Sequence, residues 1–556
     1  MLRDTVLINA AIQQGLFDTE LMASTQRKAR REQRDLLTAL AFASRLPVSA
    51  FYRAYGALHQ VPFISGKRIQ ASAALMRKLP RNLVERKLII AMEPLAGDSD
   101  ERIRLVMADP EDQASIQQVK RLLGKPVVIF LAEPSVLTPL IKHANQRPTP
   151  GIDTGKPQQD DVAAFDPVFA LNSIFDEAYL QRASDIHMEP LKESVQIRLR
   201  VDGGLQEYPT PFSLKEGLSM MSRLKVIASL DISEQRMPQD GSLTHTVADG
   251  TEFDVRVATI PTRFGERATM RLLGSDEDAL SLKQIGMSAG DEQRFTAAIN
   301  KPYGMILITG PTGSGKSTTL YSSLQEIAGD DINILTAEDP VEYVMEGISQ
   351  VQVNNKVTFA DALRSFLRHD PDVIMVGEIR DGETAQIALK AAMTGHLVFS
   401  TLHTNSALGV ISRLVDMGTE SFLLGATLLA VIAQRLVRRL CPNCKRERDA
   451  TPHECAQLGI AHNNGTKICE AVGCSACMDR GYKGRLALFE TFWVDEESAE
   501  LISQGASEQV LAAQAKQFYS LAKDGIAKTL QGHTSMDELA RLSLLLPVVQ
   551  EGEQQP

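Results

Sequence analysis

The sequence of 556 residues is poor in cysteine and in long apolar runs, and each shortage excludes a class of protein. Six cysteines in this length exclude a secreted scaffold that is held together by disulfides. The longest apolar stretch, residues 422–433, is interrupted by Gly425 and Thr427 and is shorter than the roughly 20 residues that span a bilayer. The first residues lack a continuous apolar segment, so we expect no signal peptide and no transmembrane segment. We therefore expect a soluble multidomain protein of a reducing compartment.

An excess of positive charge is also missing. The 59 Lys and Arg residues are outnumbered by 69 Asp and Glu residues, which gives a formal net charge of −10. This balance argues against charge-driven binding of the whole chain to nucleic acid or acidic lipid, although it allows a local basic patch. The hydrophobic share of 44% is ordinary for a globular protein. The length predicts about two to four domains.

Changes in composition and hydrophobic periodicity divide the chain into segments. Residues 143–161 are rich in Pro, Gly, Asp and Gln and poor in apolar residues, which is typical of a linker. From 195 to 201 apolar and polar residues alternate as in a half-buried strand, and beyond 305 short apolar strands alternate with helical stretches as in a parallel α/β sheet. The predicted segments are a helical N-terminal region (1–60), a small α+β domain (61–142), a linker (143–163), a second α+β domain (164–275), a parallel α/β core (276–437), a cysteine-bearing insertion (438–490) and a C-terminal helical region (491–556).

Two parts of the N-terminal region carry apolar residues at helical spacing, one from Leu7 to Ile12 and one from Leu36 to Ala41. Residues 26–34 lie between them and are dense in positive charge. We interpret this run as a solvated helix face, which is the ordinary place for such charges.

The strongest pattern in the sequence is the glycine-rich segment GPTGSGKS at residues 310–317. It fits the phosphate-binding pattern of a Gly, four residues, a Gly, a Lys and a Ser or Thr. An apolar strand is predicted directly before it and a helix directly after it, which is the context that phosphate binding requires. Lys316 would reach the β- and γ-phosphates, and the Ser317 hydroxyl would ligate Mg²⁺. The predicted nucleotide-binding residues are Gly310, Pro311, Thr312, Gly313, Ser314, Gly315, Lys316, Ser317 and Thr318.

Three later segments carry polar side chains where a predicted strand stops, ILTAEDPVE at 334–342, DPDVIMVGEIRD at 370–381 and TGHLVFSTLHT at 394–404. The carboxyl ends of parallel strands meet at one edge of a sheet, and ligands bind at that edge. Phosphoryl transfer to water needs a metal clamp, a positioned water and neutralisation of charge. The side chains that would supply them are Glu338, Asp339, Glu378 and His403. Taken singly, each is also compatible with a helix cap, a surface ion pair or a core histidine.

With these motifs in this order, the sequence resembles the secretion ATPases of type II secretion and type IV pilus assembly, the GspE–PilB group, over about residues 165–490. Residues 336–342 are similar to its aspartate box, 373–378 to its atypical Walker B segment, in which Gly377 stands where other P-loop enzymes carry Asp, and 394–404 to its histidine box. The resemblance implies an α/β, RecA-like P-loop core with a preceding α+β (PAS-like) domain and N-terminal α and α+β adaptor domains. It implies that Glu378 is the catalytic base, that Glu338 and Asp339 position metal and water, and that His403 senses the γ-phosphate.

The domain before the P-loop carries further parts of the resemblance, ASDIHMEP at 183–190 and RLRVDGGL at 198–205. In this group the domain supplies arginines to the nucleotide phosphates, sometimes across a subunit boundary, and a guanidinium fork suits that charge. The group commonly has an arginine after the QDG of residues 239–241, where this chain has Ser242. The sequence leaves the choice open among Arg223, Arg236, Arg256, Arg267 and Arg271.

Two CxxC pairs, separated by 29 residues, give an independent signal. Four thiolates from two such knuckles make a closed tetrahedral zinc site. The predicted zinc ligands are Cys441, Cys444, Cys474 and Cys477, and the group that the sequence resembles carries an insertion here. Redox dithiols and a site that has lost its metal are the alternatives, and Cys455 and Cys469 are spare thiols. The region is also basic. The resemblance implies that this is a surface facing a membrane partner, whereas the residues alone favour an ordinary solvated patch.

The resemblance implies a cytoplasmic, Mg²⁺-dependent ATP hydrolase that acts as a mechanical motor and associates peripherally with the inner membrane through its partners. ATP binding would close the α+β domain onto the P-loop domain, and hydrolysis would reopen it. The implied partners are further copies in a homohexamer, an inner-membrane platform protein that adds or extrudes pilin-like subunits, and the cytoplasmic segment of a membrane anchor protein. We expect no stable nucleic-acid partner.

Two other classes of function stay open at this point. One is a nucleic-acid translocase, such as a type IV secretion-like traffic ATPase, and the other is a nucleotide-gated scaffold that does not hydrolyse ATP. Some members of the group bind cyclic di-GMP through a helix with an RLG triplet, and residues 7–16 have a similar rhythm without that triplet. The sequence does not choose between a type II secretion system and a type IV pilus.

Overall fold

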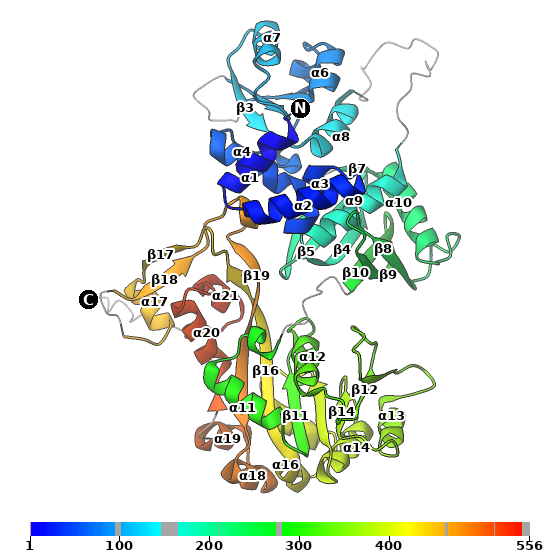
Figure 1. Ribbon diagram of the computed structural model, residues 1–556, viewed down its shortest axis with the longest axis vertical. Coiled ribbons are helices and arrows are strands. Elements are labelled where there is room, and N and C mark those ends of the chain that lie inside the picture. The colour runs from blue at the N-terminus through cyan, green and yellow to red at the C-terminus, as the bar shows by residue number, and fades with distance from the viewer. Residues whose placement is uncertain are drawn as a thin grey trace, which may run out of the picture. The chain divides into compact units, whose positions relative to one another are not determined.

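The computed structural model describes residues 2–94, 102–145, 165–209, 211–273, 281–461, 465–515 and 518–546, and Figure 1 shows their secondary structure. The chain forms two compact units. The first unit comprises residues 1–275 with 474–479, and the second comprises 276–473 with 480–556. Among the described residues, no helix is both long and apolar enough to cross a membrane. Most of the predicted linker, residues 146–163, lies outside the described residues.

The first unit begins with four helices that share one apolar core. Asp18 and Asp35 cap two of them, because each carboxylate accepts a hydrogen bond at 2.8 Å from a backbone N–H of the first turn, that of Leu21 and that of Thr38. Leu7 and Phe51 are fully buried in this core. The helices are α1 (Asp4–Gln13), α2 (Thr19–Glu32), α3 (Leu36–Ser44) and α4 (Val48–His59).

A three-stranded sheet of order β1-β2-β3 follows, with β1 and β2 antiparallel and β2 and β3 parallel. The strand β3 spans Val127–Leu131. Together with its helices the sheet forms a small α/β layer with its own core. The elements are α5 (Ala73–Met76), α6 (Arg81–Lys87), β1 (Ile89–Met92), β2 (Ile103–Met107), α7 (Gln113–Leu123), β3 and α8 (Pro134–Asn145).

The rest of the first unit is an antiparallel sheet of order β6-β5-β4-β10-β9-β8. Its alternating sequence makes one face apolar, and α9 and α10 pack on that face. Ser213 and Glu216 form a capping box at the start of α10. The opposite face of the sheet is therefore polar. The elements are α9 (Pro167–Leu180), β4 (Ala183–Pro190), β5 (Ser194–Val201), β6 (Gly204–Glu207), β7 (Phe212–Ser213), α10 (Leu214–Ile227), β8 (Gln239–Thr246), β9 (Glu252–Thr262) and β10 (Gly265–Leu273).

The second unit is built on a sheet of order β13-β12-β14-β15-β11-β16-β19-β20, in which the strands from β13 to β16 run parallel. Every residue of β11, β14 and β15 is buried, because helices cover both faces of the sheet (Figure 1). This confirms the predicted α/β core. The elements are α11 (Ala289–Ile299), β11 (Gly304–Thr309), α12 (Lys316–Ile327), β12 (Ile334–Glu338), β13 (Ser349–Gln352), α13 (Phe359–Phe366), β14 (Val373–Val376), α14 (Gly382–Met393), β15 (Leu397–Leu402), α15 (Leu408–Asp416), α16 (Ser421–Thr427) and β16 (Leu428–Leu440).

The remaining part of the second unit extends the sheet with the antiparallel strand β19 and adds a small two-stranded sheet. The residues 422–433, whose apolar run is too short for a membrane span, form most of α16 and the start of β16; Phe422 is exposed, whereas residues 430–433 of the strand are buried in the core. The elements are β17 (Arg446–Asp449), α17 (Pro452–Gln457), β18 (Lys467–Glu470), β19 (Tyr482–Trp493), α18 (Glu496–Ser503), α19 (Glu508–Gln514), β20 (Phe518–Tyr519), α20 (Leu521–Leu530) and α21 (Met536–Arg541).

Candidate functional site

The glycine-rich loop lies where the sequence predicts it, between the end of β11 and the start of α12. Gly313 and Gly315 have φ angles of 77° and 88°, in the left-handed region that favours glycine. A Cβ at Gly310 would lie 2.5 Å from the backbone oxygen of Gln434, so no side chain fits there. The loop therefore keeps its backbone N–H groups close to the N-terminus of α12, which is the arrangement that binds phosphate.

Two side chains of the loop have polar atoms placed for an anion. The Lys316 ammonium donates hydrogen bonds to the backbone oxygens of Gly310 at 2.8 Å and Pro311 at 3.2 Å. Burial lowers the pKa of Lys316, and the nearby charge of Glu378 acts in the opposite direction. The Ser314 hydroxyl is buried without a hydrogen-bond partner among the described residues. The residues present thus fit a phosphate group, and Ser317 and Thr318 lie half-buried at the start of α12.

The strand that carries the histidine box lies directly beside the P-loop strand. β11 and β15 are parallel neighbours in a register that pairs Thr309 with Leu402. Their ends are joined by a hydrogen bond of 2.8 Å between the hydroxyls of Thr309 and Thr404. His403 therefore stands at the tip of β15, level with the start of the P-loop, and its side chain is half exposed.

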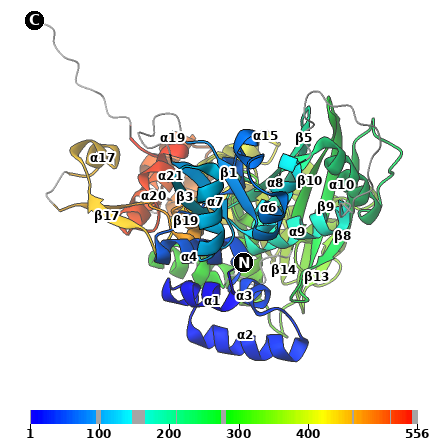
Figure 2. The same cartoon turned by 90° about the horizontal axis from the view of Figure 1, so that it is seen from above.

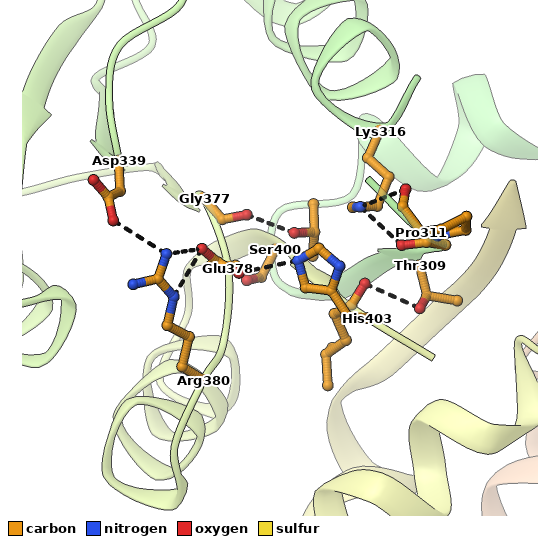
Figure 3. Close-up of polar contacts among 12 residues, drawn as sticks. Thr309, Pro311, Lys316, Asp339, Gly377, Glu378, Arg380, Ser400 and His403 are labelled. Atoms are coloured by element: carbon orange, nitrogen blue, oxygen red, sulfur yellow. Dashed lines mark hydrogen bonds and ion pairs between the residues drawn. The ribbon is translucent and has the colours of Figure 1, made fainter. Parts of the chain in front are cut away.

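Glu378 lies at the centre of a polar cluster that follows β14 (Figure 3). One of its carboxylate oxygens lies 3.1 Å from Nε2 of His403, and the other accepts a hydrogen bond of 2.8 Å from Nε of Arg380. Arg380 also reaches Asp339, with 3.1 Å between Nη2 and Oδ2. The structure thus brings three of the predicted site residues, Glu378, His403 and Asp339, into one cluster through Arg380.

The surroundings of Glu378 set its protonation state. Partial burial acts to raise the pKa of its carboxyl group, but the hydrogen bond and charge of Arg380, together with His403, outweigh burial and leave the pKa lowered. Glu378 is therefore a carboxylate at neutral pH. That is the state in which a general base accepts a proton.

Glu338 is placed differently from the other predicted residues. It is buried at the end of β12, where it accepts hydrogen bonds from Thr336 at 2.6 Å, from Gln350 at 3.0 Å and from the hydroxyl of Tyr321. Tyr321 belongs to the P-loop helix α12, so Glu338 links that helix to the sheet. Within the described residues, its hydrogen bonds do not join it to Glu378 or to His403.

Two residues of β16 that the motifs did not point to lie against the P-loop. Gln434 is buried and accepts a hydrogen bond of 2.9 Å from Thr319, and its backbone oxygen is the atom that excludes a side chain at Gly310. Arg435 lies next to it, and its Nη1 would be 3.1 Å from a Cβ at Gly310. Burial lowers the pKa of Arg435 and Glu490 opposes this effect, so the P-loop has a second half-buried cation beside Lys316.

Residues 158–541 match the family described as Type II/IV secretion system protein, which is more than half of the chain. The chain belongs to this family. Residues 59–151 match a second family description, the MshEN domain. The P-loop and the strand-end cluster of Glu378 and His403 both lie within the residues that match the secretion-system family.

The relatives of this secretion-system protein include proteins of type II secretion and of type IV pilus assembly. It is 42% identical over 510 residues to the type II secretion system protein E of Klebsiella pneumoniae, which covers 90% of this chain and 98% of the relative. It is 39% identical over 555 residues to the type IV pilus assembly ATPase PilB of Myxococcus xanthus, which covers 95% of this chain and 97% of the relative. The solved ATPase DotB of Legionella pneumophila has the same fold, with a TM-score of 0.51 at 24% identity, over 69% of this chain and 98% of that chain.

The polar face of the sheet in the first unit carries three of the five predicted arginines of the secretion-system protein. Arg256 pairs across the strands with Arg271, and Arg267 lies two residues from Thr269, which pairs with His187. Arg198 and Arg200 of β5 join them on this face, because Arg198 pairs with His187. Arg223 instead belongs to α10, on the apolar side, and Arg236 lies in the exposed loop before β8.

Two carboxylates hold four of these guanidinium groups. Asp185 lies 3.0 Å from Arg271 and 3.7 Å from Arg200. Glu189, on the other side of His187 along β4, forms ion pairs with Arg198 at 2.6 Å and with Arg267 at 3.6 Å. Burial lowers the pKa of His187, the carboxylate of Asp185 opposes this, and Arg200, Arg267 and Arg198 lower it further. Around His187, four guanidinium groups thus accompany two carboxylates, and this local excess of positive charge suits an anionic ligand.

The four predicted zinc ligands form a cluster. The sulfur atoms of Cys441, Cys444, Cys474 and Cys477 all lie within 4.8 Å of one another. The sulfurs of Cys474 and Cys477 are 3.7 Å apart, and an edge of a tetrahedron of thiolates around zinc, with Zn–S distances of about 2.3 Å, is about 3.8 Å long. Backbone N–H groups of Gly473 and Cys474 donate to two of the sulfurs. The donor set therefore fits a structural zinc ion.

Three of the basic residues around the cysteine cluster are neutralised within the second unit. Arg438 pairs with the buried Glu538 at 2.8 Å, and Arg448 pairs with Glu454 and Glu470. Glu470 also pairs with Arg446. These ion pairs leave less free charge for a partner than the sequence suggested.

Proposed function

We propose that this protein hydrolyses ATP with Mg²⁺ and that hydrolysis drives the assembly of a type IV pilus or of a type II secretion pseudopilus. The names of the relatives support this role, because they include a type II secretion ATPase E and a type IV pilus assembly ATPase. The observation that carries the proposal is the cluster at the strand ends beside the P-loop. There an ionised Glu378 contacts His403, and His403 stands level with the loop that holds Lys316.

The chemistry follows from what these side chains do. Lys316 exchanges its two backbone oxygens for the phosphate oxygens, which form stronger, charge-assisted hydrogen bonds. Glu378 leaves Arg380, orients a water molecule and accepts its proton, while His403 contacts the γ-phosphate. Arg435 neutralises charge that develops on the phosphates. Ser317 would hold the Mg²⁺ ion, which neutralises the β- and γ-phosphate oxygens.

Glu338 and Asp339 have different parts in this proposal. Asp339 holds Arg380 and provides the place to which that guanidinium withdraws when Glu378 turns to the water molecule. Glu338 keeps α12 aligned with the sheet through Tyr321 and helps to position metal and water through the groups that it holds. Arg256, Arg267 and Arg271 are the arginines of the first unit that we expect to contact the phosphates, because they share the polar sheet face.

We infer the assembly and location of the motor from its family. The protein works as a homohexamer in the cytoplasm, peripherally associated with the inner membrane. It acts on an inner-membrane platform protein and is held by the cytoplasmic segment of a membrane anchor protein. The cysteine cluster binds zinc and keeps the insertion folded around it.

The decisive experiment compares Lys316→Ala with the matched control Lys390→Ala, an exposed lysine on α14. We expect the purified wild type and the control to retain adenine nucleotide with Mg²⁺ and to release phosphate, and we expect Lys316→Ala to do neither. Hydrolysis by Lys316→Ala at the wild-type rate would contradict the proposed site. Strong stimulation of hydrolysis by DNA at low salt, lost at high salt, would instead favour a nucleic-acid translocase.

A further inference from the structure

The helix α2 lies at the outer edge of the N-terminal helices (Figure 2), and its two opposite faces carry different side chains. Thr25 and Ala29 are buried against α3, with the half-buried Leu21 and Met22 beside them. The other face carries basic side chains. At about 100° per residue, three of these lie on the side directly away from Thr25 and Ala29. The basic residues, all exposed, are Arg27, Lys28, Arg30 and Arg31.

These four cations are not neutralised within the part of the chain that the structure describes. The ion pair of this segment joins Arg34 to Glu32, at 3.3 Å, and leaves the other cations without a carboxylate partner. Arg27 and Arg31 are four residues apart on the helix, and Lys28 and Arg31 are three apart, so like charges lie side by side. Such pairs destabilise a helix. The helix dipole favours cations only in the last turn, which includes Arg30 and Arg31 but not Arg27 or Lys28.

The charges on this face therefore weaken the isolated helix, which is the opposite of what a purely structural role predicts. The exposed residues that precede the cations on this face are the small Ala23 and Ser24 and, in the first turn, Glu20. Interfaces between proteins depend on buried aromatic or large apolar anchors, and this face offers none. We therefore expect this face to recognise a ligand by its charge and not by its shape.

We propose that the basic face of α2 (Arg27, Lys28, Arg30 and Arg31) binds the anionic headgroups of a membrane surface. An anionic bilayer presents many phosphate charges in one plane, which matches an array of cations that has no pocket. The helix lies flat on the surface and stays packed on α3, because its apolar residues are already buried in the protein. This site is separate from the P-loop, so it stands or falls independently of the proposed ATP hydrolysis.

The expected strength follows from the number of charges. Each cation near an anionic bilayer adds about fivefold to the affinity, so removing four predicts a loss of several hundredfold. The test uses the full-length protein and co-sedimentation with vesicles of phosphatidylcholine, with or without phosphatidylglycerol. We expect the wild type to bind only the vesicles with phosphatidylglycerol and to release them at high salt.

The test variant is Arg27→Gln/Lys28→Gln/Arg30→Gln/Arg31→Gln. Its control is Arg77→Gln/Lys78→Gln/Arg86→Gln/Arg121→Gln, which removes the same charges from exposed positions of the same unit. We expect the test variant to lose vesicle binding several hundredfold and the control to keep it within a few-fold. Both should keep the thermal midpoint and basal ATP hydrolysis of the wild type, which verifies that they fold.

Three results would overturn the proposal. The first is equal binding of the wild type to vesicles with and without phosphatidylglycerol. The second is a loss of binding in the control variant as large as in the test variant. The third is binding of the wild type to polyglutamate, lost in the test variant, together with no binding to either vesicle, which would assign the face to an acidic protein instead.

Discussion

Glu378 and His403 follow neighbouring parallel strands of the second unit, and their side chains meet with 3.1 Å between Oε2 and Nε2. The carboxylate is shared, because its other oxygen is held by Arg380. In this arrangement the Glu378 carboxylate is ionised, but Arg380 and His403 contact both of its oxygens. Its activity as a base therefore depends on the release of Arg380, which links hydrolysis to the contents of the site.

Replacement of Glu378 by Gln removes the proposed base and keeps the shape of the side chain. We expect kcat for ATP hydrolysis to fall by about 10²–10⁴-fold, since general-base catalysis contributes that much, while nucleotide affinity changes little. Phosphate release under saturating ATP, together with titration of a fluorescent nucleotide analogue, separates the two effects. Glu326→Gln, at an exposed position of α12, is the control and should behave like the wild type. A wild-type kcat in Glu378→Gln would rule out Glu378 as the base.

Arg380 controls the pH dependence of the reaction through Glu378. Because Arg380 lowers the pKa of Glu378, its removal in Arg380→Ala should raise that pKa. A base is active when it is deprotonated, so the acid limb of the profile of kcat/KM against pH should move to higher pH in the variant. Arg364→Ala, at an exposed position of α13, serves as the control. An acid limb that stays in place would show that Glu378 is not the titrating base.

Sequence motifs predicted the P-loop and the strand-end groups because both depend on short segments. The glycines of 310–315, Lys316 and the start of α12 form one local unit, and parallel pairing brings the ends of β14 and β15 together in any sheet of this kind. Gln434 and Arg435 were missed for the opposite reason. They lie more than a hundred residues after the P-loop, and only the pairing of β11 with β16 places them beside it.

The choice among the five arginines also depended on the pairing of strands that are distant in the sequence. Strand alternation places Arg256 on the same face as Asp254, and this much was readable from the sequence. The same face gathers four arginines around His187, namely Arg198, Arg200, Arg267 and Arg271. Their gathering depends on the register of β4 with β5 and β10. Likewise, TAEDPVE suggested that Glu338 and Asp339 act together, but the turn after β12 sends Asp339 to Arg380 and leaves Glu338 with Tyr321.

Two glutamates inside the first unit predict a pH-dependent stability. Burial and the charge of Glu177 raise the pKa of Glu133 from an ordinary 4.5 to about 8, and burial raises that of Glu177 to about 7. The native state then holds protons that the unfolded chain has released, so the free energy of unfolding of this unit should fall as the pH rises from about 5 to 8. Each tenfold change in proton affinity is worth about 1.4 kcal/mol.

Replacement of Glu133 by Gln should remove much of that dependence. The urea midpoint, followed by far-UV circular dichroism, should fall between pH 6 and pH 8.5 in the wild type and in the control Glu193→Gln, and should fall less in Glu133→Gln. The single tryptophan, Trp493, belongs to the second unit, so its fluorescence reports that unit separately and should be unaffected. Equal midpoint shifts in wild type and Glu133→Gln would contradict the raised pKa.

The cysteine cluster predicts a metal content that can be counted. We expect the purified protein to contain one zinc ion per chain by elemental analysis, and Cys474→Ser to lose it, because three thiolates leave a tetrahedral site incomplete. Cys469→Ser is the control, since Cys469 stands outside the cluster, and it should keep its zinc. Because structural zinc contributes directly to folding, Cys474→Ser and the chelated wild type should both show a lower thermal midpoint and faster cleavage by trypsin within residues 438–490. If Cys474→Ser kept a full complement of zinc, or if Cys469→Ser lost it, the four cysteines would not be the ligands.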